Sequence, residues 1–145
     1  MRIAVASDHA GFELKELIAG HLKAGGHEVV DLGTNDTTSV DYPDFGAAIG
    51  KAVVAEQAEL GVAICGSGIG ICIAANKIEG VRAATVHDVT SARMTRLHNN
   101  ANIMCLGERF IGQQVALDSV DAFISAEFEG GRHARRVDKI AKLER

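Results

Sequence analysis

The stretch Leu60-Gly61-Val62-Ala63-Ile64-Cys65, LGVAIC, runs directly into Gly66-Ser67-Gly68-Ile69-Gly70, GSGIG. An unbroken run of apolar and small residues, bounded by a turn signal, is typical of a strand buried on both faces of a parallel sheet. The glycines predict a tight turn at the carboxyl end of this strand, and a helical pattern follows to about Lys77. The stretch therefore predicts one strand–loop–helix unit of an α/β fold.

The same alternation of strand and helix signals recurs along the chain. Further strands are expected at residues 2–7, 27–32, 81–86 and 102–106. Helices are expected at residues 14–22, 45–57, 89–97 and 113–126, with a basic helix from near Gly131 and a long polar loop at 33–44. The pattern predicts a single domain over residues 1–145, a three-layer doubly wound (Rossmann-like) α/β fold. Its five-stranded parallel sheet has helices on both faces and is followed by a C-terminal basic helix.

Composition excludes several classes of protein. The formal net charge of −4 argues against a general nucleic-acid binder. No apolar run approaches the roughly 18 residues of a membrane span. The three cysteines form no CxxC pair, and no signal peptide precedes Arg2, so we expect reduced thiols and a cytoplasmic protein. No Cys/His spacing resembles a metal site.

The glycine loop matches neither common nucleotide motif. Its spacing is GxGxG rather than GxGxxG, and the lysine of a Walker A loop is absent. Backbone N–H groups at the start of a helix nevertheless stabilise negative charge, so residues 66–70 are a candidate anion cradle. The alternative is a tight turn that allows close packing of the following helix.

Cys65 directly precedes this loop, at the end of the expected strand and near the start of the expected helix. Thiol pKa values fall near a helix N-terminus. A thiolate there is a candidate base or nucleophile. The alternative for any cysteine is a small buried hydrophobe, and this reading suits Cys72 within the helix and Cys105 within a strand.

Basic residues gather near the C-terminus. Arg132 and Arg136 are four residues apart on a helix, so they face the same way, and an anion between them would remove their repulsion. A solvated basic tail is the alternative. His9 and His98 lie at helix ends, where a histidine is either catalytic or without a catalytic task.

These motifs together resemble one family. The residues that carry the resemblance are Ser7-Asp8-His9-Ala10-Gly11 with Lys15, Asp41-Tyr42-Pro43, Cys65-Gly66-Ser67-Gly68-Ile69-Gly70, Ala74-Ala75-Asn76-Lys77, His98-Asn99, Gly107-Glu108-Arg109 and Gly130-Gly131-Arg132-His133-x-x-Arg136. They are similar to those of the ribose/galactose isomerase family, in its type B ribose-5-phosphate isomerase branch. The resemblance runs from residue 2 to about residue 143.

The resemblance implies an aldose–ketose isomerase of the pentose phosphate pathway that needs no cofactor and no metal. Its substrate would be a phosphorylated pentose: ribose 5-phosphate and ribulose 5-phosphate would interconvert through a cis-enediolate. It also implies a homodimer, or a dimer of dimers, in which two subunits share each active site.

Roles follow from the resemblance position by position. Cys65 corresponds to the base, Ser67 to a hydroxyl that shifts a proton between O1 and O2, and His98, assisted by Asp8, to the group that opens the sugar ring. The substrate-binding positions are His9, Tyr42, Gly66, Gly68, Ile69, Gly70, Asn99, Arg109, Arg132 and Arg136. Of these, residues 66–70 would hold the enediolate, while His9, Arg109, Arg132 and Arg136 would contact phosphate. Asn99 and His98 would come from the neighbouring subunit.

Two departures and three alternatives qualify this interpretation. Some relatives use a glutamate four residues after a serine as the base, but Ile69 occupies that position here, which favours the cysteine-base branch. Serine at 67 replaces a frequent threonine. The substrate could instead be allose or galactose 6-phosphate. The chain could also be a nucleotide-binding regulatory module or an inactive paralogue, although Cys65, His98 and the helix arginines together argue against the last.

Overall fold

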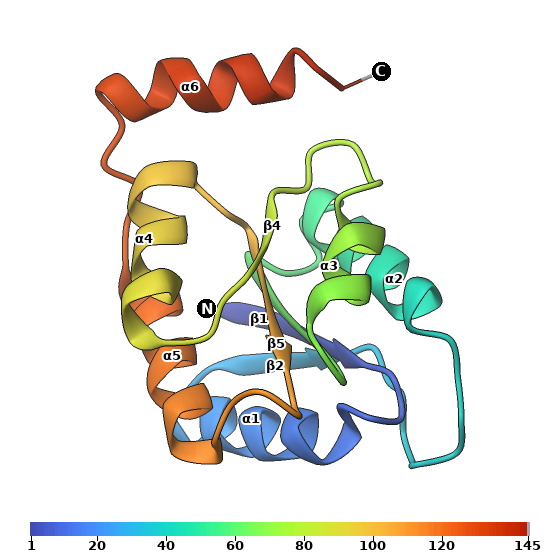
Figure 1. Cartoon of the computed structure of the whole chain (residues 1–145). Coiled ribbons are helices and arrows are strands. Elements are labelled where there is room, and N and C mark those ends of the chain that lie inside the picture. The colour runs from blue at the N-terminus through green and yellow to red at the C-terminus, as the bar shows by residue number, and fades with distance from the viewer. Residues whose placement is uncertain (145) are drawn as a thin grey trace.

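The computed structural model describes residues 1–144, and a parallel sheet lies at its centre (Figure 1). Its strands are β1 (Arg2–Ser7), β2 (Glu28–Asp31), β3 (Leu60–Cys65), β4 (Ala83–Thr85) and β5 (Ile103–Gly107). They pair in the order β2-β1-β3-β5-β4, and every pairing is parallel. All residues of β3 and β5 are buried, as their uniformly apolar sequences require.

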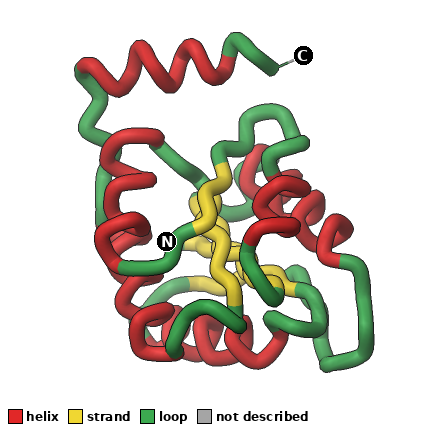
Figure 2. The backbone as a smooth tube through the Cα atoms, viewed as in Figure 1, coloured by secondary structure: helices red, strands yellow, loops and turns green. Residues whose placement is uncertain are grey.

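Helices cover both faces of this sheet. They are α1 (Phe12–Ala24), α2 (Tyr42–Val54), α3 (Ile69–Ala75), α4 (Val89–Asn99), α5 (Gln113–Ser125) and α6 (Arg132–Ala141). One core cluster joins the sheet to α1, α4 and α5, and a second joins it to α2 and α3. Figure 2 shows the strands gathered between these two groups of helices. The prediction of a three-layer doubly wound fold is therefore confirmed.

The helix α6 lies outside this three-layer arrangement. It follows α5 through a short connection and packs beside the end of α4, at the top of Figure 1. Only His133 and Val137 are buried among its ten residues, so most of its surface is exposed in the single chain. Among residues 1–144, no helix combines the length and the apolar character that crossing a membrane demands.

Two predicted boundaries were wrong. The sequence predicted a helix at 45–57, but α2 begins at Tyr42 and ends at Val54. Pro43 was interpreted as a loop residue, whereas proline fits the first turn of a helix because the N–H that it lacks has no partner there. The strand expected at 81–86 is only three residues long. It lies at the edge of the sheet, where one side has no strand to pair with.

An ion pair between a buried lysine and a partly exposed aspartate fixes the start of the loop that follows β2. The side chain of Lys15 has no exposed surface, and its Nζ donates to both carboxylate oxygens of Asp31 at 2.9 and 2.8 Å. Asp31 Oδ1 also accepts the N–H of Gly33 at 2.9 Å. Gly33 and Thr34 in turn exchange backbone hydrogen bonds with Ser7, the residue before Asp8. The ion pair thus helps to set the carboxyl end of β1.

We expect Lys15→Met to lower the free energy of unfolding by about 1–3 kcal/mol, because it removes charge-assisted hydrogen bonds and leaves Asp31 without its partner. Urea denaturation followed by circular dichroism measures this change. Lys23→Met, at an exposed position on the same helix, should stay within about 0.5 kcal/mol of the original chain. Equal losses in the two variants would contradict the stabilising role of the Lys15–Asp31 pair.

Candidate active site

The turn between β3 and α3 depends on a glycine. Gly68 has φ +74°, a left-handed conformation that strains residues with a side chain. A Cβ at this position would lie 2.7 Å from the carbonyl carbon of Leu106, so the backbones of the two segments touch. The hydroxyl of Thr85 donates to the Gly68 carbonyl at 2.9 Å and holds the turn from β4. The loop is therefore fixed by contacts from both β5 and β4.

Cys65 lies at the base of this turn and is only 4% exposed. The backbone N–H of Gly68 donates to its Sγ at 3.1 Å. The first N–H groups of α3 follow directly on this turn and place positive partial charge near the sulfur. The Ser67 hydroxyl oxygen accepts the N–H of Ile69 at 3.2 Å, which orients that side chain at the same turn.

A pocket of about 500 Å³ opens in front of Cys65. It is lined by Asp8, His9, Ala10, Tyr42, Cys65, Gly66, Ser67, Ile69, Gly70, Ile73 and Arg109. These residues come from the ends of β1, β3 and β5, from the start of α2 and from α3. They lie at the edge where a doubly wound sheet binds its ligands. The structure thus gathers nine of the predicted site residues around one pocket, and it adds Ala10 and Ile73.

The end of β5 locks the loop in place. The N–H groups of Glu108 and Arg109 donate to the carbonyls of Cys65 and Gly66 at 3.0 and 3.1 Å. A Cβ at Gly107 would lie 2.5 Å from the backbone of Ser67, and a Cβ at Gly66 would lie 3.0 Å from the Arg109 guanidinium. The guanidinium is therefore stacked against the loop, beside the pocket that it lines.

The polar residues after β1 have defined partners. Asp8 is 6% exposed, and its Oδ1 accepts the N–H of Gly11 at 3.1 Å. His9 Nδ1 lies 3.1 Å from the backbone nitrogen of Val40 and 3.2 Å from its carbonyl oxygen, so the loop before α2 holds the imidazole ring. Both side chains are thus oriented at the pocket wall before any ligand binds.

Glu108 is a partly buried acid for which the sequence motifs predicted no role. Its Oε2 is buried and has no hydrogen-bond partner among residues 1–144. Burial, with repulsion from Glu13 and Asp8, raises the pKa of this carboxyl, while the N–H of Leu14 opposes the shift. Its place in the sequence beside Arg109 was visible, but its approach to α1 depends on the fold.

The other two cysteines are buried, as the sequence predicted. They are not chemically equivalent. A hydrogen bond from the Cys105 thiol, with further ones from Thr85, lowers the pKa of Cys72 to about 6 against the opposing effect of burial. The pKa of Cys105 rises well above its usual value, because it donates to Cys72 and is buried. The sequence spacing gave no signal of this pairing between α3 and β5.

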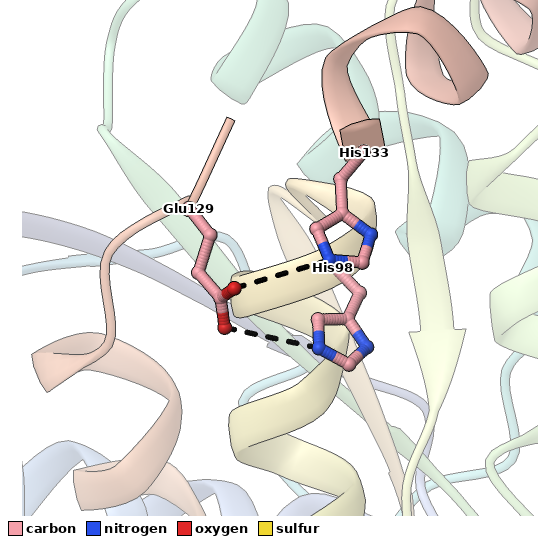
Figure 3. A group of neighbouring side chains, drawn as sticks. All are labelled: His98, Glu129 and His133. Carbon is pink, nitrogen blue, oxygen red and sulfur yellow. Dashed lines mark ion pairs between the residues drawn. The ribbon is translucent and has the colours of Figure 1, made fainter. Parts of the chain in front are cut away.

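Five predicted site residues do not line the pocket, and one of them, Gly68, lies within the glycine loop itself. His98 and Asn99 end α4, and Arg132 and Arg136 lie exposed on α6. His98 stacks on His133, with ring centroids 4.2 Å apart, and both rings face Glu129 (Figure 3). Within one chain, the predicted site is therefore divided into a pocket at the sheet edge and a second group at the junction of α4 and α6.

A profile of the ribose/galactose isomerase family matches residues 3–140 of the chain. The chain belongs to the ribose/galactose isomerase family. It is 42% identical over 143 residues to ribose-5-phosphate isomerase B of Escherichia coli, with 99% of this chain and 96% of that protein covered. The resemblance expected from the motifs is thus confirmed.

Solved structures of ribose/galactose isomerase family members agree with this assignment. The ribose-5-phosphate isomerase B of Clostridium thermocellum is 52% identical and superposes with a TM-score of 0.98, over 99% of this chain and 97% of that one. The enzyme of Mycoplasma genitalium, solved with bound ribulose 5-phosphate, is 46% identical with a TM-score of 0.93, over 98% of this chain and 95% of that one. The likeness therefore covers the pocket and α6 alike.

Proposed function

We propose that this chain is an isomerase that interconverts ribose 5-phosphate and ribulose 5-phosphate through a cis-enediolate. The observation that carries the proposal is the position of Cys65, whose sulfur accepts an N–H at the base of a pocket of sugar-phosphate size. Relatives named ribose-5-phosphate isomerase B support the substrate, and one of their structures holds ribulose 5-phosphate. The family assignment favours this activity over a nucleotide-binding module.

Proton transfer between carbons is the central step. The Cys65 thiolate takes the proton from C2 of the open-chain aldose, and the electron pair moves through the C1–C2 bond onto O1. A proton then passes from O2 to O1, aided by the Ser67 hydroxyl. The Cys65 thiol finally returns its proton to C1, which leaves a C2 ketone and a thiolate ready for the next turnover.

The charge that forms on oxygen needs donors already in place. The first N–H groups of α3 have no partner within the helix, and they lie on the loop that carries Cys65. Donors of this kind are typically worth about 3–4 kcal/mol each in the transition state. A single loop therefore supplies both the base and part of the oxyanion stabilisation.

Ring opening and phosphate binding use residues from two chains. Asp8, His9 and Arg109 belong to the pocket, while His98, Asn99, Arg132 and Arg136 lie away from it in the same chain. A second copy that brings its α4–α6 junction to this pocket completes the site. His98 then opens the furanose ring with Asp8, and the arginines of both chains hold the phosphate.

The assembly is thus a homodimer, or a dimer of dimers, with shared active sites. The exposed apolar side chains of Ile140 and Leu143 near the end of α6 support this, because a partner would cover them. A cytoplasmic location is supported by the three free cysteines, which an oxidising compartment would put at risk.

An assay with ribose 5-phosphate in the presence of EDTA tests the proposed function. We expect ribulose 5-phosphate to form, with a kcat/KM well above those for allose and galactose 6-phosphates. Substantial activity on a hexose phosphate alone would replace the pentose by that sugar and keep the same proton transfer. Absence of isomerisation of all three sugars would overturn the proposal.

Arg136→Ala should raise KM for ribose 5-phosphate by about tenfold or more and change kcat much less, because it removes a charge-assisted contact far from the reacting carbons. Steady-state kinetics separates the two parameters. Arg135→Ala is the matched control, since Arg135 is also exposed on α6 but is not among the expected phosphate contacts. An unchanged KM in Arg136→Ala would remove that arginine from the phosphate site.

A further inference from the structure

Two histidines and a glutamate meet where α4 and α6 join. His98 stands in the last turn of α4, His133 in the first turn of α6, and Glu129 in the connection before α6. Each imidazole turns its Nε2 toward the carboxylate, at 3.8 Å for His98 and 3.9 Å for His133 (Figure 3). One nitrogen or oxygen atom from each residue lies within 4.8 Å of the others.

The backbone fixes this arrangement. The N–H of Glu129 donates to the carbonyl of Leu97 at 3.1 Å, which ties the connection to the end of α4. The N–H of His133 donates to the carbonyl of Gly130 at 3.0 Å. The three side chains are therefore brought together without a hydrogen bond between them, because distances of 3.8 and 3.9 Å are too long for one.

The chemistry of the group suits a metal ion. A neutral imidazole has a free lone pair, which is the form that metals bind. Two imidazoles and one carboxylate are also the protein ligands of many open zinc sites, in which water or another molecule takes the fourth position.

We propose that His98, Glu129 and His133 form a binding site for Zn²⁺ or a similar transition-metal ion. A tetrahedral zinc ion with bonds of about 2.0–2.1 Å separates its ligand atoms by about 3.3–3.4 Å. The two measured gaps therefore need to close by about half an ångström. The exposed carboxylate of Glu129 has this freedom.

The stacked histidine rings must also change their orientation. Their planes differ by only 11°, and parallel rings cannot both direct a lone pair at one ion. The His98 side chain is 29% exposed and His133 only 9%, so His98 is the ring that turns. The positive charge of Arg132 opposes the ion, and the site should bind more weakly than a closed structural zinc site.

Occupation of the site has a consequence that rests on the proposed function. The metal occupies His98, on which ring opening depends in the proposed mechanism, so Zn²⁺ is a reversible inhibitor that competes with the sugar phosphate. No metal site was expected from the sequence. The spacing along the chain gave no signal of this one, because its three ligands come from a helix end, a connection and a helix start.

Calorimetric titration of the EDTA-treated full-length protein with Zn²⁺ tests the site directly. We expect one ion per chain, with affinity reduced by more than about tenfold in Glu129→Gln and in His133→Asn. His21→Asn is the matched control, because His21 also pairs with a carboxylate, 2.8 Å from Asp121. This substitution should leave the titration unchanged. Titration with Co²⁺ should give the intense visible absorption of a tetrahedral ion.

The metal site and the inhibition by Zn²⁺ are tested by different measurements. Equal Zn²⁺ affinity in Glu129→Gln, His133→Asn and the unaltered chain would overturn the site, as would loss of binding in His21→Asn. Isomerase assays in added Zn²⁺, reversed by EDTA, test the inhibition. Zinc binding without inhibition would overturn the inhibitory role alone. Since the titration needs no substrate, it decides the metal site even if the isomerase activity proves to be absent.

Discussion

Cys65→Ala should lower kcat for the isomerisation of ribose 5-phosphate by about 10²–10⁴-fold, the usual contribution of a general base. The substitution removes the side chain that carries the proton between C2 and C1 in the proposed mechanism. Binding of the sugar phosphate should change little, since His9 and the arginines remain. Steady-state kinetics and calorimetric titration with a non-reacting phosphorylated sugar measure the two effects.

Cys72→Ala is the control for this experiment. Cys72 has the lowered thiol pKa, yet it is buried in α3 and does not line the pocket. Its removal should leave kcat within a few-fold of the original value. If Cys65→Ala kept near-normal kcat, or if Cys72→Ala lost activity while remaining folded, Cys65 would not be the base.

Gly107→Ala should lower kcat/KM by about 10²-fold, although residue 107 carries no catalytic group. The added Cβ would lie 2.5 Å from the carbonyl carbon and oxygen of Ser67, where only a shift of backbone relieves the clash. Such a shift displaces residues 66–70 from the geometry that the transition state requires. Overpacking of this kind also destabilises a fold by about 1–3 kcal/mol, which thermal unfolding would reveal.

Gly112→Ala provides the comparison for this change. A Cβ at Gly112 would meet nothing within 4 Å, and its φ of −72° suits any residue. Activity and melting temperature should both stay close to those of the original chain. If the two alanine variants behaved alike, the contact between the end of β5 and the loop would not matter for catalysis.

The central strands could be predicted from the sequence with correct bounds. Residues 2–7 and 60–65 are unbroken runs of mainly apolar residues between turn signals. A short apolar run bounded in this way indicates a strand that is buried on both faces. The start of α2 could not be predicted in the same way. Pro43 signals a loop and the first turn of a helix equally well, and only the packing of α2 on the sheet decides between them.

The pocket was also partly predictable, because parallel strands place their carboxyl ends at one edge. Asp8, Cys65 and Arg109 follow three such ends and do line one pocket. Their catalytic roles remain predictions. The contact of Thr85 with the loop, and the meeting of His98 with Glu129, depend on how connections run between elements. No local sequence pattern predicts the course of these connections.

The interlocking of the glycine loop with the end of β5 has a consequence for the order in which the protein matures. Residues 66–70 leave the ribosome well before residues 107–109, which supply the backbone contacts that fix the loop. A nascent chain that ends before Gly107 lacks these contacts, even with β1 and β3 already synthesised. Chains elongate from the N-terminus and domains fold as units. Catalytic competence therefore arises late in synthesis, although the thiol itself is in place early.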